Sequence, residues 1–332
     1  MKILLSHGDG GKLTHELVKN IFHRAFHNDH LQEEGDAAAL TLASGNIMVS
    51  TDSYVISPMH FPGGNIGKLA ITGTMNDLAV SGAIPQYITA GFILEEGLDM
   101  EELRGIVQSM AHTAQQAGVR LVAGDTKVVE RGKGDGLYIN TTGIGINRHP
   151  GRLAYSCIQP GDRILINGAI AEHTIAVLSA RAGLEFSPPI LSDCASLHSM
   201  IQSLLDQFHS IRFMRDPTRG GVATTLQEIA LKTSLDLELY EEHLPVTDQV
   251  RGAVEILGLD PLYLANEGKV ILIVGEQEAD AVIKWMREKF DQQLAGVIGR
   301  VRKGQGKVWL KTAFGGTRRI EMLSGAPLPR IC

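Results

Sequence analysis

The sequence predicts an α+β protein made of two α/β domains with mixed sheets, followed by a flexible C-terminal tail. Its 332 residues, 44% of them hydrophobic and 20% charged, are enough to bury two separate cores. Strand-like runs and helical segments flank residues 147–161, which contain two prolines and two glycines and which we interpret as the connection between the domains. We expect the domains at residues 1–150 and 151–305, with a C-terminal segment and mobile tail at 306–332.

The first domain is expected to form one α+β unit. Apolar runs at residues 47–51 and 119–123 predict strands that lead into Asp52 and Asp125, so both carboxylates should lie just past strand ends. A further strand is predicted at 137–146. Between them, apolar residues recur at spacings of three and four, which predicts an amphipathic helix packed on a sheet: Leu103, Ile106, Val107, Met110, Ala114 and Ala117.

The second domain is expected to be a separate α/β unit. The apolar run at residues 163–166 predicts its first strand, and the segments that follow alternate between helix and strand patterns. Helices are predicted near 172–183, 194–209 and 219–232, and strands near 236–240 and 270–274.

Composition excludes several classes of function. A net charge of −6 gives no electrostatic reason to bind nucleic acid. The N-terminal apolar run is too short for a signal peptide, and no uninterrupted apolar run is long enough to span a membrane. The cysteines Cys157, Cys194 and Cys332 are widely spaced and match neither a disulfide framework nor a metal knuckle. We therefore expect a cytoplasmic protein that acts away from membranes and nucleic acid.

The last residue of the sequence is a cysteine, which we expect to lie on an extended arm. Pro327 and Pro329 fix φ and favour a polyproline-like conformation ahead of Cys332. Such an arm could reach roughly 30 Å, which would let the sulfur visit both a partner protein and an internal pocket. The alternative is a frayed terminus that happens to end in cysteine.

A nucleotide site is suggested by glycines and aspartates. The glycine-rich residues 7–12 could approach phosphates, although neither a P-loop nor a GxGxxG motif is present. Magnesium is normally held by one or two carboxylates together with water and nucleotide phosphates, so convergent aspartates beside glycines suit Mg-ATP. The alternative for each is a cap or an Asx turn. The candidates are Asp36, Asp52, Asp77 and Asp125.

Two further elements carry groups suited to acid–base chemistry. Lys127 follows the second predicted strand, and Glu267 stands at the mouth of the apolar strand 270–274, where desolvation can raise the pKa of its carboxyl group toward the general-base range. A solvated surface ion pair is the alternative for both. Residues Asp216 to Gly221 combine an N-cap with Arg219 ahead of a helix whose first amides could bind phosphate, and an ordinary capped helix start is equally consistent.

Eight motifs together resemble the HypE family of nickel-iron hydrogenase maturation factors, within the aminoimidazole ribonucleotide synthetase (PurM-like) superfamily. The terminal PRIC is the most specific, because ATP-binding relatives in the superfamily lack it. One departure is Asp9, where the family loop often has serine, and a carboxylate there would repel phosphate. The motifs are SHGDGG (6–11), STDSYVI (50–56), FPGGNIGK (61–68), NDLAVSGAIP (76–85), GDTKVV (124–129), DPTRGG (216–221), ANEGK (265–269) and PRIC (329–332).

The resemblance implies a homodimer that associates through PurM-like N-terminal domains, with Mg-ATP bound between the two domains. It implies that a carbamoyltransferase, HypF, loads a carbamoyl group onto the C-terminal thiol. ATP would then activate the amide oxygen, and loss of phosphate would leave a protein thiocyanate. The cyano group would pass to iron on a HypC–HypD scaffold complex.

The resemblance also implies roles for individual residues. Cys332 would accept the carbamoyl group, and Lys127 and Glu267 would be the bases. Arg330 would lower the pKa of the thiol whereas the terminal carboxylate would raise it, so we expect its reactivity to depend on docking. Mg-ATP would be held by Asp36, Asp52, Asp77 and Asp125 as metal ligands, with Asn65, Lys68, Asp216 and Arg219 as further nucleotide contacts.

Two alternatives remain at this point. The first is another ATP-dependent enzyme of the superfamily, such as a selenophosphate synthetase or a thiamine-monophosphate kinase. A selenophosphate synthetase would carry a reactive cysteine or selenocysteine in its N-terminal glycine loop, and no cysteine precedes Cys157. The second is an adaptor that binds ATP as a structural ligand and presents its tail as a docking peptide, which ATP turnover that depends on Cys332 would exclude.

Overall fold

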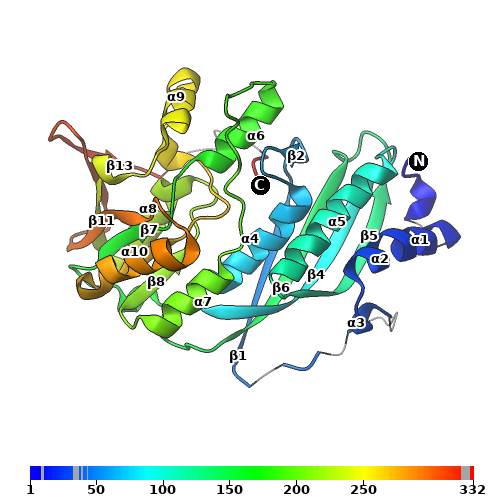
Figure 1. The fold of residues 1–332 in the computed structure, drawn as a ribbon, viewed down its shortest axis with the longest axis horizontal. Coiled ribbons are helices and arrows are strands. Elements are labelled where there is room, and N and C mark those ends of the chain that lie inside the picture. Colours follow the sequence, from blue (N-terminus) through cyan, green and yellow to red (C-terminus); the bar gives the residue numbers. More distant parts are fainter. Residues whose placement is uncertain (9–10, 33–36, 39, 43, 323–329) are drawn as a thin grey trace.

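The computed structural model describes residues 1–8, 11–32, 37–38, 40–42, 44–322 and 330–332. Two sheets with separate cores make up the molecule, and the C-terminal residue lies between them (Figure 1). Asp9, Asp36 and the prolines Pro327 and Pro329, all of which entered the sequence predictions, lie outside the described residues. No helix in the described ranges is long and apolar enough to cross a membrane.

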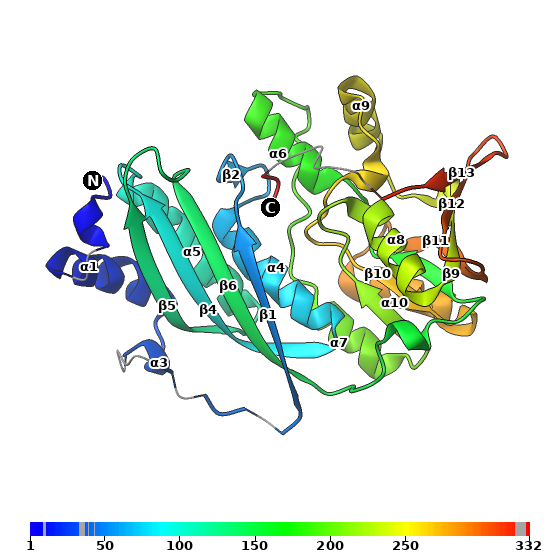
Figure 2. The same cartoon turned by 180° about the vertical axis from the view of Figure 1, so that it is seen from behind.

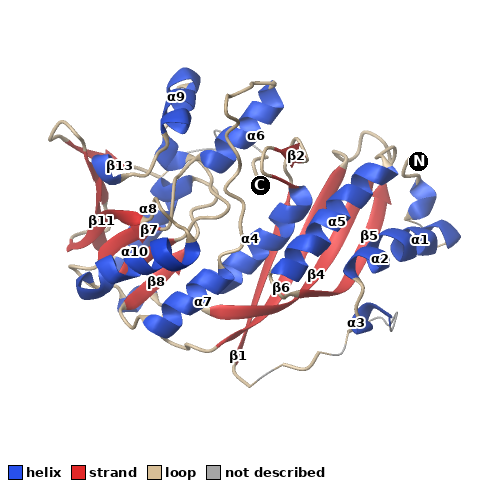
Figure 3. Ribbon diagram, in the orientation of Figure 1, coloured by secondary structure: helices blue, strands red, loops and turns tan. Residues whose placement is uncertain are grey.

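The N-terminal half is a two-layer unit. Its sheet has the order β1-β6-β4-β5, in which β4 and β5 run parallel and the other pairs are antiparallel. Helices α4 and α5 cover one face (Figure 3), whereas the view from behind shows no helix of the described chain over the other face (Figure 2). The elements are β1 (Asn46–Tyr54), α4 (Ile66–Val80), β4 (Ala83–Glu95), α5 (Met100–Gln116), β5 (Arg120–Val129) and β6 (Leu137–Asn147).

The chain ahead of β1 forms short helical segments beside β5 (Figure 1). They are η1 (Leu5–His7), α1 (Lys12–Leu17), η2 (Val18–His23), α2 (Arg24–Phe26) and α3 (Asp29–Gln32). A two-stranded ribbon of β2 (His60–Phe61) and β3 (Gly64–Asn65) leads into α4.

Two strand predictions were right in place but wrong in length. Strand β1 runs to Tyr54 and β5 runs to Val129, so Asp52 and Asp125 lie inside strands and not beyond their ends. Alternation of exposed and less exposed residues continues through the polar part of β1. Backbone pairing with β6 and β4 therefore extends these strands through residues that the apolar runs did not include.

The sequence patterns missed helix α4 and strand β4. Thirteen of the fifteen residues of α4 are buried, because the helix packs between the first sheet, α5 and α7 (His198–Gln207). A helix that is apolar on all sides lacks the amphipathic period that reveals a surface helix. Strand β4 contains Pro85, and proline argues against a central strand. The structure accommodates it at an irregularity in the pairing between β4 and β6.

The C-terminal half is a seven-stranded mixed sheet, as the fold class predicted. Its order is β13-β12-β9-β11-β7-β10-β8, with β12 and β9 parallel. Helices α7 and α10 pack on one face and α8 on the other. The strands are β7 (Arg163–Ile166), β8 (Ile211–Arg215), β9 (Leu235–Tyr240), β10 (Ile271–Val274), β11 (Gly296–Lys303), β12 (Val308–Lys311) and β13 (Thr317–Ile320). The helices are α6 (Glu172–Ala182), α7, α8 (Gly221–Thr233), α9 (Asp248–Leu257) and α10 (Glu276–Phe290).

Several predicted elements of this half are confirmed. Strands 163–166 and 270–274 and the helices near 172–183 and 219–232 match β7, β10, α6 and α8 within two residues. Helix α7 begins at His198, four residues later than predicted. Strands β12 and β13 of the segment 306–332 extend this sheet, whereas the domain boundaries at 150 and 305 stay predictions.

Candidate active site

A cavity of about 620 Å³ lies where the two halves meet. Strand β1 and helix α4 line it from the first half, and β8, α8 and the loop before β10 line it from the second. Six of the residues that the sequence singled out are on its walls: Asp52, Asp77, Asp216, Arg219, Glu267 and Cys332. Segments that are far apart in the sequence therefore combine here into one site.

The carboxylates in this cavity are poorly hydrated and repel one another. Burial, followed by the charge of Asp77, raises the pKa of Asp52 to about 6. Burial raises the pKa of Asp216 to about 7 and also raises that of Asp77, which accepts a 2.6 Å hydrogen bond from the Ser50 hydroxyl. These three carboxyl groups would therefore release protons when they bind a cation.

A metal ion in this cavity would depend on ligands from outside the chain. Within the described ranges, no three histidine, cysteine, aspartate or glutamate side chains converge closely enough to hold a metal. Magnesium commonly takes one or two carboxylates and completes its shell with water and phosphate oxygens. The separated carboxylates therefore fit a metal that arrives bound to a phosphate ligand.

Glu267 is the most buried acid of the site. Its side chain is almost inaccessible, and one carboxylate oxygen, Oε1, has no hydrogen-bond partner. Burial, reinforced by the charge of Asp193, raises the pKa of this carboxyl group well above its usual range. The main chain of Glu267 is anchored from both halves, because its carbonyl accepts from Asn76 Nδ2 at 3.1 Å and its amide donates to Asp193 Oδ1 at 3.1 Å.

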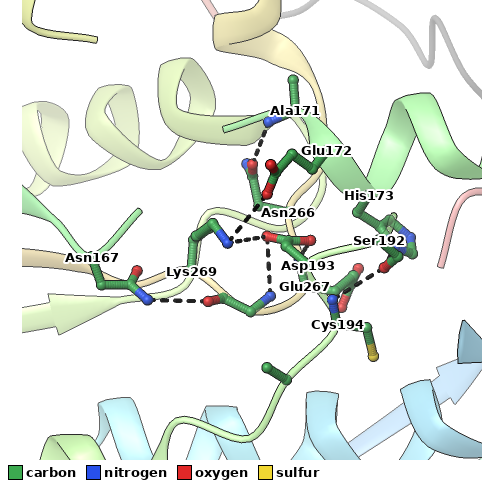
Figure 4. Close-up of polar contacts among 12 residues, drawn as sticks. Asn167, Ala171, Glu172, His173, Ser192, Asp193, Cys194, Asn266, Glu267 and Lys269 are labelled. Atoms are coloured by element: carbon green, nitrogen blue, oxygen red, sulfur yellow. Dashed lines mark hydrogen bonds and ion pairs between the residues drawn. The ribbon is translucent and has the colours of Figure 1, made fainter. Parts of the chain in front are cut away.

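A buried ion pair supports the loop that carries Glu267 (Figure 4). Lys269 Nζ lies 3.3 Å from Asp193 Oδ2 and 3.7 Å from Glu172 Oε2, and the Asp193 side chain has no exposed area. Asp193 Oδ2 also accepts from the amide of Gly268 at 3.3 Å. Asn167 Nδ2 donates to the Gly268 carbonyl at 3.2 Å. Both peptide units beside Glu267 are therefore fixed.

The last residues of the chain are docked in this site. Ile331 is buried in the core of the first half, and Cys332 lines the cavity. Burial, followed by the charge of Glu267, raises the pKa of the Cys332 thiol to about 12, so the docked sulfur is protonated at neutral pH. Since the thiolate is the reactive form, reaction with an electrophile requires the tail to leave this position.

Lys127 and Asp125 lie on the opposite side of the first sheet from this cavity. Asp125 pairs across β4 with Gly91, which pairs with Asn140 and hence with Ser53 of β1. Because successive residues of a strand point to opposite faces, Asp125 points away from the side that Asp52 faces. Lys127 follows two residues later and donates to both oxygens of Asp125 at 2.7 Å. Within one chain, the two proposed bases do not meet.

Asn65 and Lys68 lie outside the cavity lining. Asn65 is the N-cap of α4, and its Oδ1 accepts from the Lys68 amide at 2.9 Å. Lys68 Nζ donates to the Gly63 carbonyl at 3.0 Å. Their contacts in this state are structural, and their proposed contact with nucleotide stays a prediction.

Sequence reasoning missed three polar residues that organise the site, namely His173, Ser192 and Asp193. No motif spacing marks them, since they come from the start of α6 and from the connection to α7. Their role is visible only through contacts with the Glu267 loop and with the tail.

Replacement of Gly268 by alanine should displace the Glu267 loop. A Cβ at this position would clash with the main-chain carbonyl oxygen of Asp193. We expect a loss of stability of about 1–3 kcal/mol, in the range for overpacking in a tight interior, because backbone must move on one side. Chemical denaturation measures it, and Gly252→Ala, where a Cβ meets open space, is the matched control. Equal stability of the two variants would contradict this interpretation.

Comparison with known proteins identifies the class of the chain. Residues 34–147 match the family of AIR synthase related proteins, N-terminal domain, and residues 159–311 match the corresponding C-terminal domain. Carbamoyl dehydratase HypE of Azotobacter vinelandii is 46% identical over 98% of this chain and 96% of its own. The chain is thus a two-domain AIR synthase-related protein.

Solved structures narrow the identification. Hydrogenase maturation protein HypE in complex with ATP superposes with a TM-score of 0.96 at 45% identity, covering 99% of both chains. A chain of the HypE–HypF complex superposes with a TM-score of 0.81 at 43% identity, covering 92% of this chain and 99% of that one. Together with the curated relatives, these matches show that the chain belongs to the HypE family.

Proposed function

We propose that this protein uses ATP to dehydrate a carbamoyl group carried on Cys332, which gives a protein thiocyanate and thereby the cyanide ligand of a nickel-iron hydrogenase. The observation that carries the proposal is the docking of Cys332 in the same cavity as Glu267, Asp52, Asp77 and Asp216. The HypE relatives named carbamoyl dehydratases and the relative solved with ATP support it.

The proposed reaction balances as a dehydration driven by phosphoryl transfer. The amide oxygen of the S-carbamoyl group attacks the γ-phosphorus of ATP, and ADP leaves. Two N–H protons are then lost, the C–O bond breaks with release of phosphate, and the C≡N bond forms. The S–C bond is retained throughout, so the product remains attached to Cys332. Glu267, buried and unpaired at Oε1, is in its ionised form the proposed acceptor of one of these protons.

The residues present fit Mg-ATP as the phosphate donor. Asp52, Asp77 and Asp216 supply negative charge on one wall, and Arg219 supplies a positive group on the same cavity. Bound magnesium would neutralise the carboxylates and the phosphate oxygens together. Asp36 and Asp125 are further proposed ligands, of which Asp125 lies on the other face of the sheet.

A homodimer is the proposed assembly. No described helix covers one face of the first sheet (Figure 2). By strand register Ile47, Val49 and Ile93 lie on this face, and they are 57%, 62% and 44% exposed, which gives an apolar surface suited to a second copy. Light scattering should give about twice the chain mass, and Ile93→Arg should reduce it. A monodisperse monomer would contradict this proposal.

In such a dimer, Lys127 would serve the site of the other copy. Co-expression of chains that carry Lys127→Ala with chains that carry Glu267→Gln tests this. Each homodimer should be inactive, whereas the mixed dimer should keep one complete site and regain part of the activity. If the mixed dimer does not regain activity, Lys127 does not act as a base in the site of the other copy.

Partners and location follow from the proposed reaction. A HypF-type carbamoyltransferase would load the tail, as the complex of a relative suggests, and a HypC–HypD scaffold would receive the cyano group. The three cysteines are free, in keeping with a reducing cytoplasm.

Intact mass spectrometry tests the function directly. After incubation with the carbamoyltransferase and carbamoyl phosphate, wild-type protein should gain a carbamoyl group, and addition of Mg-ATP should then remove the mass of one water. Cys332→Ala should show neither change. If the carbamoyl adduct forms but no water is lost, the protein is only a carrier of the carbamoyl group. ATP turnover that does not depend on Cys332 would favour another enzyme of the superfamily.

Binding of Mg-ATP should weaken as pH falls. Asp52 and Asp216 have pKa values of about 6 and 7, so they take up protons between pH 8 and 6 and then compete with the metal. We expect the dissociation constant to rise by up to about tenfold per pH unit for each proton displaced. Titration calorimetry at several pH values measures this, with ATP plus EDTA as control. A dissociation constant that is constant from pH 8 to 6 would place the metal elsewhere.

A further inference from the structure

The docked tail is held through its main chain. Each of residues 330–332, here called the tail, accepts a hydrogen bond through a main-chain oxygen. The Arg330 carbonyl accepts from Ser57 N at 3.3 Å and from Arg181 Nη2 at 2.8 Å. The Ile331 carbonyl accepts from His173 Nε2 at 2.9 Å, and the oxygen of Cys332 accepts from Val55 N at 3.3 Å.

His173 is the only one of these donors that is a buried side chain, among the residues that the structure describes. Its ring is completely inaccessible and packs edge-on against Phe61, with 5.4 Å between ring centres. Nε2 must carry the proton, because the Ile331 carbonyl can only accept. Nδ1 is then an acceptor, and the Ser192 hydroxyl, 2.8 Å away, donates to it. Burial lowers the pKa of His173, which keeps the ring neutral.

The residue that contacts His173 and the residue that holds the Glu267 loop are neighbours in the chain (Figure 4). Ser192 orients His173, and the next residue, Asp193, accepts the amides of Glu267 and Gly268. The Ser192 hydroxyl also accepts from the amide of Cys194 at 3.1 Å, which fixes this short segment. While the tail is hydrogen-bonded to His173, this segment therefore supports both reacting groups, Cys332 and Glu267.

We propose that His173 is a positioning residue for the proposed reaction: it holds the Ile331 carbonyl and thereby places the Cys332 sulfur in the cavity beside Glu267. This inference rests on the proposed function only for its catalytic consequence. The docking itself can be measured without carbamoyl phosphate or ATP.

Alkylation of Cys332 measures docking. The docked thiol is shielded and protonated, so iodoacetamide reacts through the fraction of molecules whose tail has left the site. The test compares alkylation rates of the Cys332 peptide in wild type and in His173→Leu, which removes the donor at similar size. Loss of one net hydrogen bond should raise the rate about 3- to 10-fold. His173→Gln keeps an N–H donor and should restore part of the protection.

Two further variants guard against general effects on folding. His198 is also partly buried, and its Nδ1 lies 2.7 Å from Ser196 Oγ. Among the residues that the structure describes it forms no hydrogen bond with the tail, so His198→Leu should keep the wild-type rate. Arg181→Met removes an exposed donor to the Arg330 carbonyl and should raise the rate without disturbing the core. A wild-type alkylation rate in folded His173→Leu would overturn the proposal. Acceleration in His198→Leu equal to that in His173→Leu would also overturn it.

The catalytic consequence is measured on preloaded protein. His173→Leu should still gain the carbamoyl group, and should lose water more slowly, because the sulfur is no longer held in place beside Glu267. Equal rates of water loss in His173→Leu and wild type would overturn the positioning role. If wild type itself never loses water, the proposed function fails, whereas the alkylation ratios still decide whether His173 holds the tail.

Discussion

Replacement of Glu267 by glutamine should leave carbamoyl loading of Cys332 intact and slow the subsequent loss of water about 10²- to 10⁴-fold, the usual cost of removing a general base. Glutamine has the same size and can occupy the same buried position, but it does not accept a proton. Intact mass spectrometry of preloaded protein in single-turnover conditions measures the rate. Undiminished loss of water would remove Glu267 from the reaction.

The same substitution should increase stability at alkaline pH. The pKa of Glu267 is raised in the folded protein by burial and by Asp193, so the folded state keeps a proton that the unfolded state releases above its ordinary pKa. The free energy of unfolding of the wild type therefore falls as pH rises between these two values. Glutamine removes this slope, and the difference between the variants should grow by up to about 1.4 kcal/mol per pH unit.

Urea denaturation at pH 5.5 and pH 8 tests the prediction on stability. Glu288→Gln is the matched control, because Glu288 lies on the exposed side of α10 and pairs weakly with Lys284 at 3.8 Å. Its stability should change little at either pH. A Glu267→Gln protein whose stability parallels that of the wild type at both values would show that the carboxyl group is already ionised in the folded state.

The sequence was most informative where several functional residues share a short motif. Asp216 and Arg219 lie three positions apart in one motif, and Glu267 lies in the short motif ANEGK, so local pattern was enough to select them. Cys332 stood out for its position after two prolines. The cavity brings Asp216, Arg219, Glu267 and Cys332 together, and their roles stay proposals.

The sequence was least informative where the position of a residue within a strand, or its burial, decides whether the residue reaches the site. Asp52 and Ser53 differ by one position and face opposite sides of a sheet, so an error of one residue in the end of a strand reverses an assignment. For this reason the separation of Asp52 from Asp125 could not be foreseen. His173 and Asp193 are single polar residues whose partners are main-chain groups far away in the sequence, and no spacing rule finds such pairs.

Replacement of Asp193 by alanine should cost about 3–5 kcal/mol of stability. It leaves the buried Lys269 with only the more distant Glu172 as a partner. It also removes the acceptor of the Glu267 and Gly268 amides. At about 2–4 °C per kcal/mol, thermal denaturation should resolve this clearly. Asp206→Ala is the matched control, since Asp206 is 74% exposed where it pairs with His149, and exposed pairs contribute little.

Asp193→Asn separates the structural role of this residue from its electrostatic role. Asparagine keeps an oxygen that can accept the Glu267 amide, so it should cost less stability than alanine. It removes a negative charge near Glu267 and frees Lys269, and both changes lower the pKa of the Glu267 carboxyl group. The pH profile for loss of water should therefore move to lower pH, whereas a residue that only supported the loop would leave the profile unmoved and lower the rate at every pH.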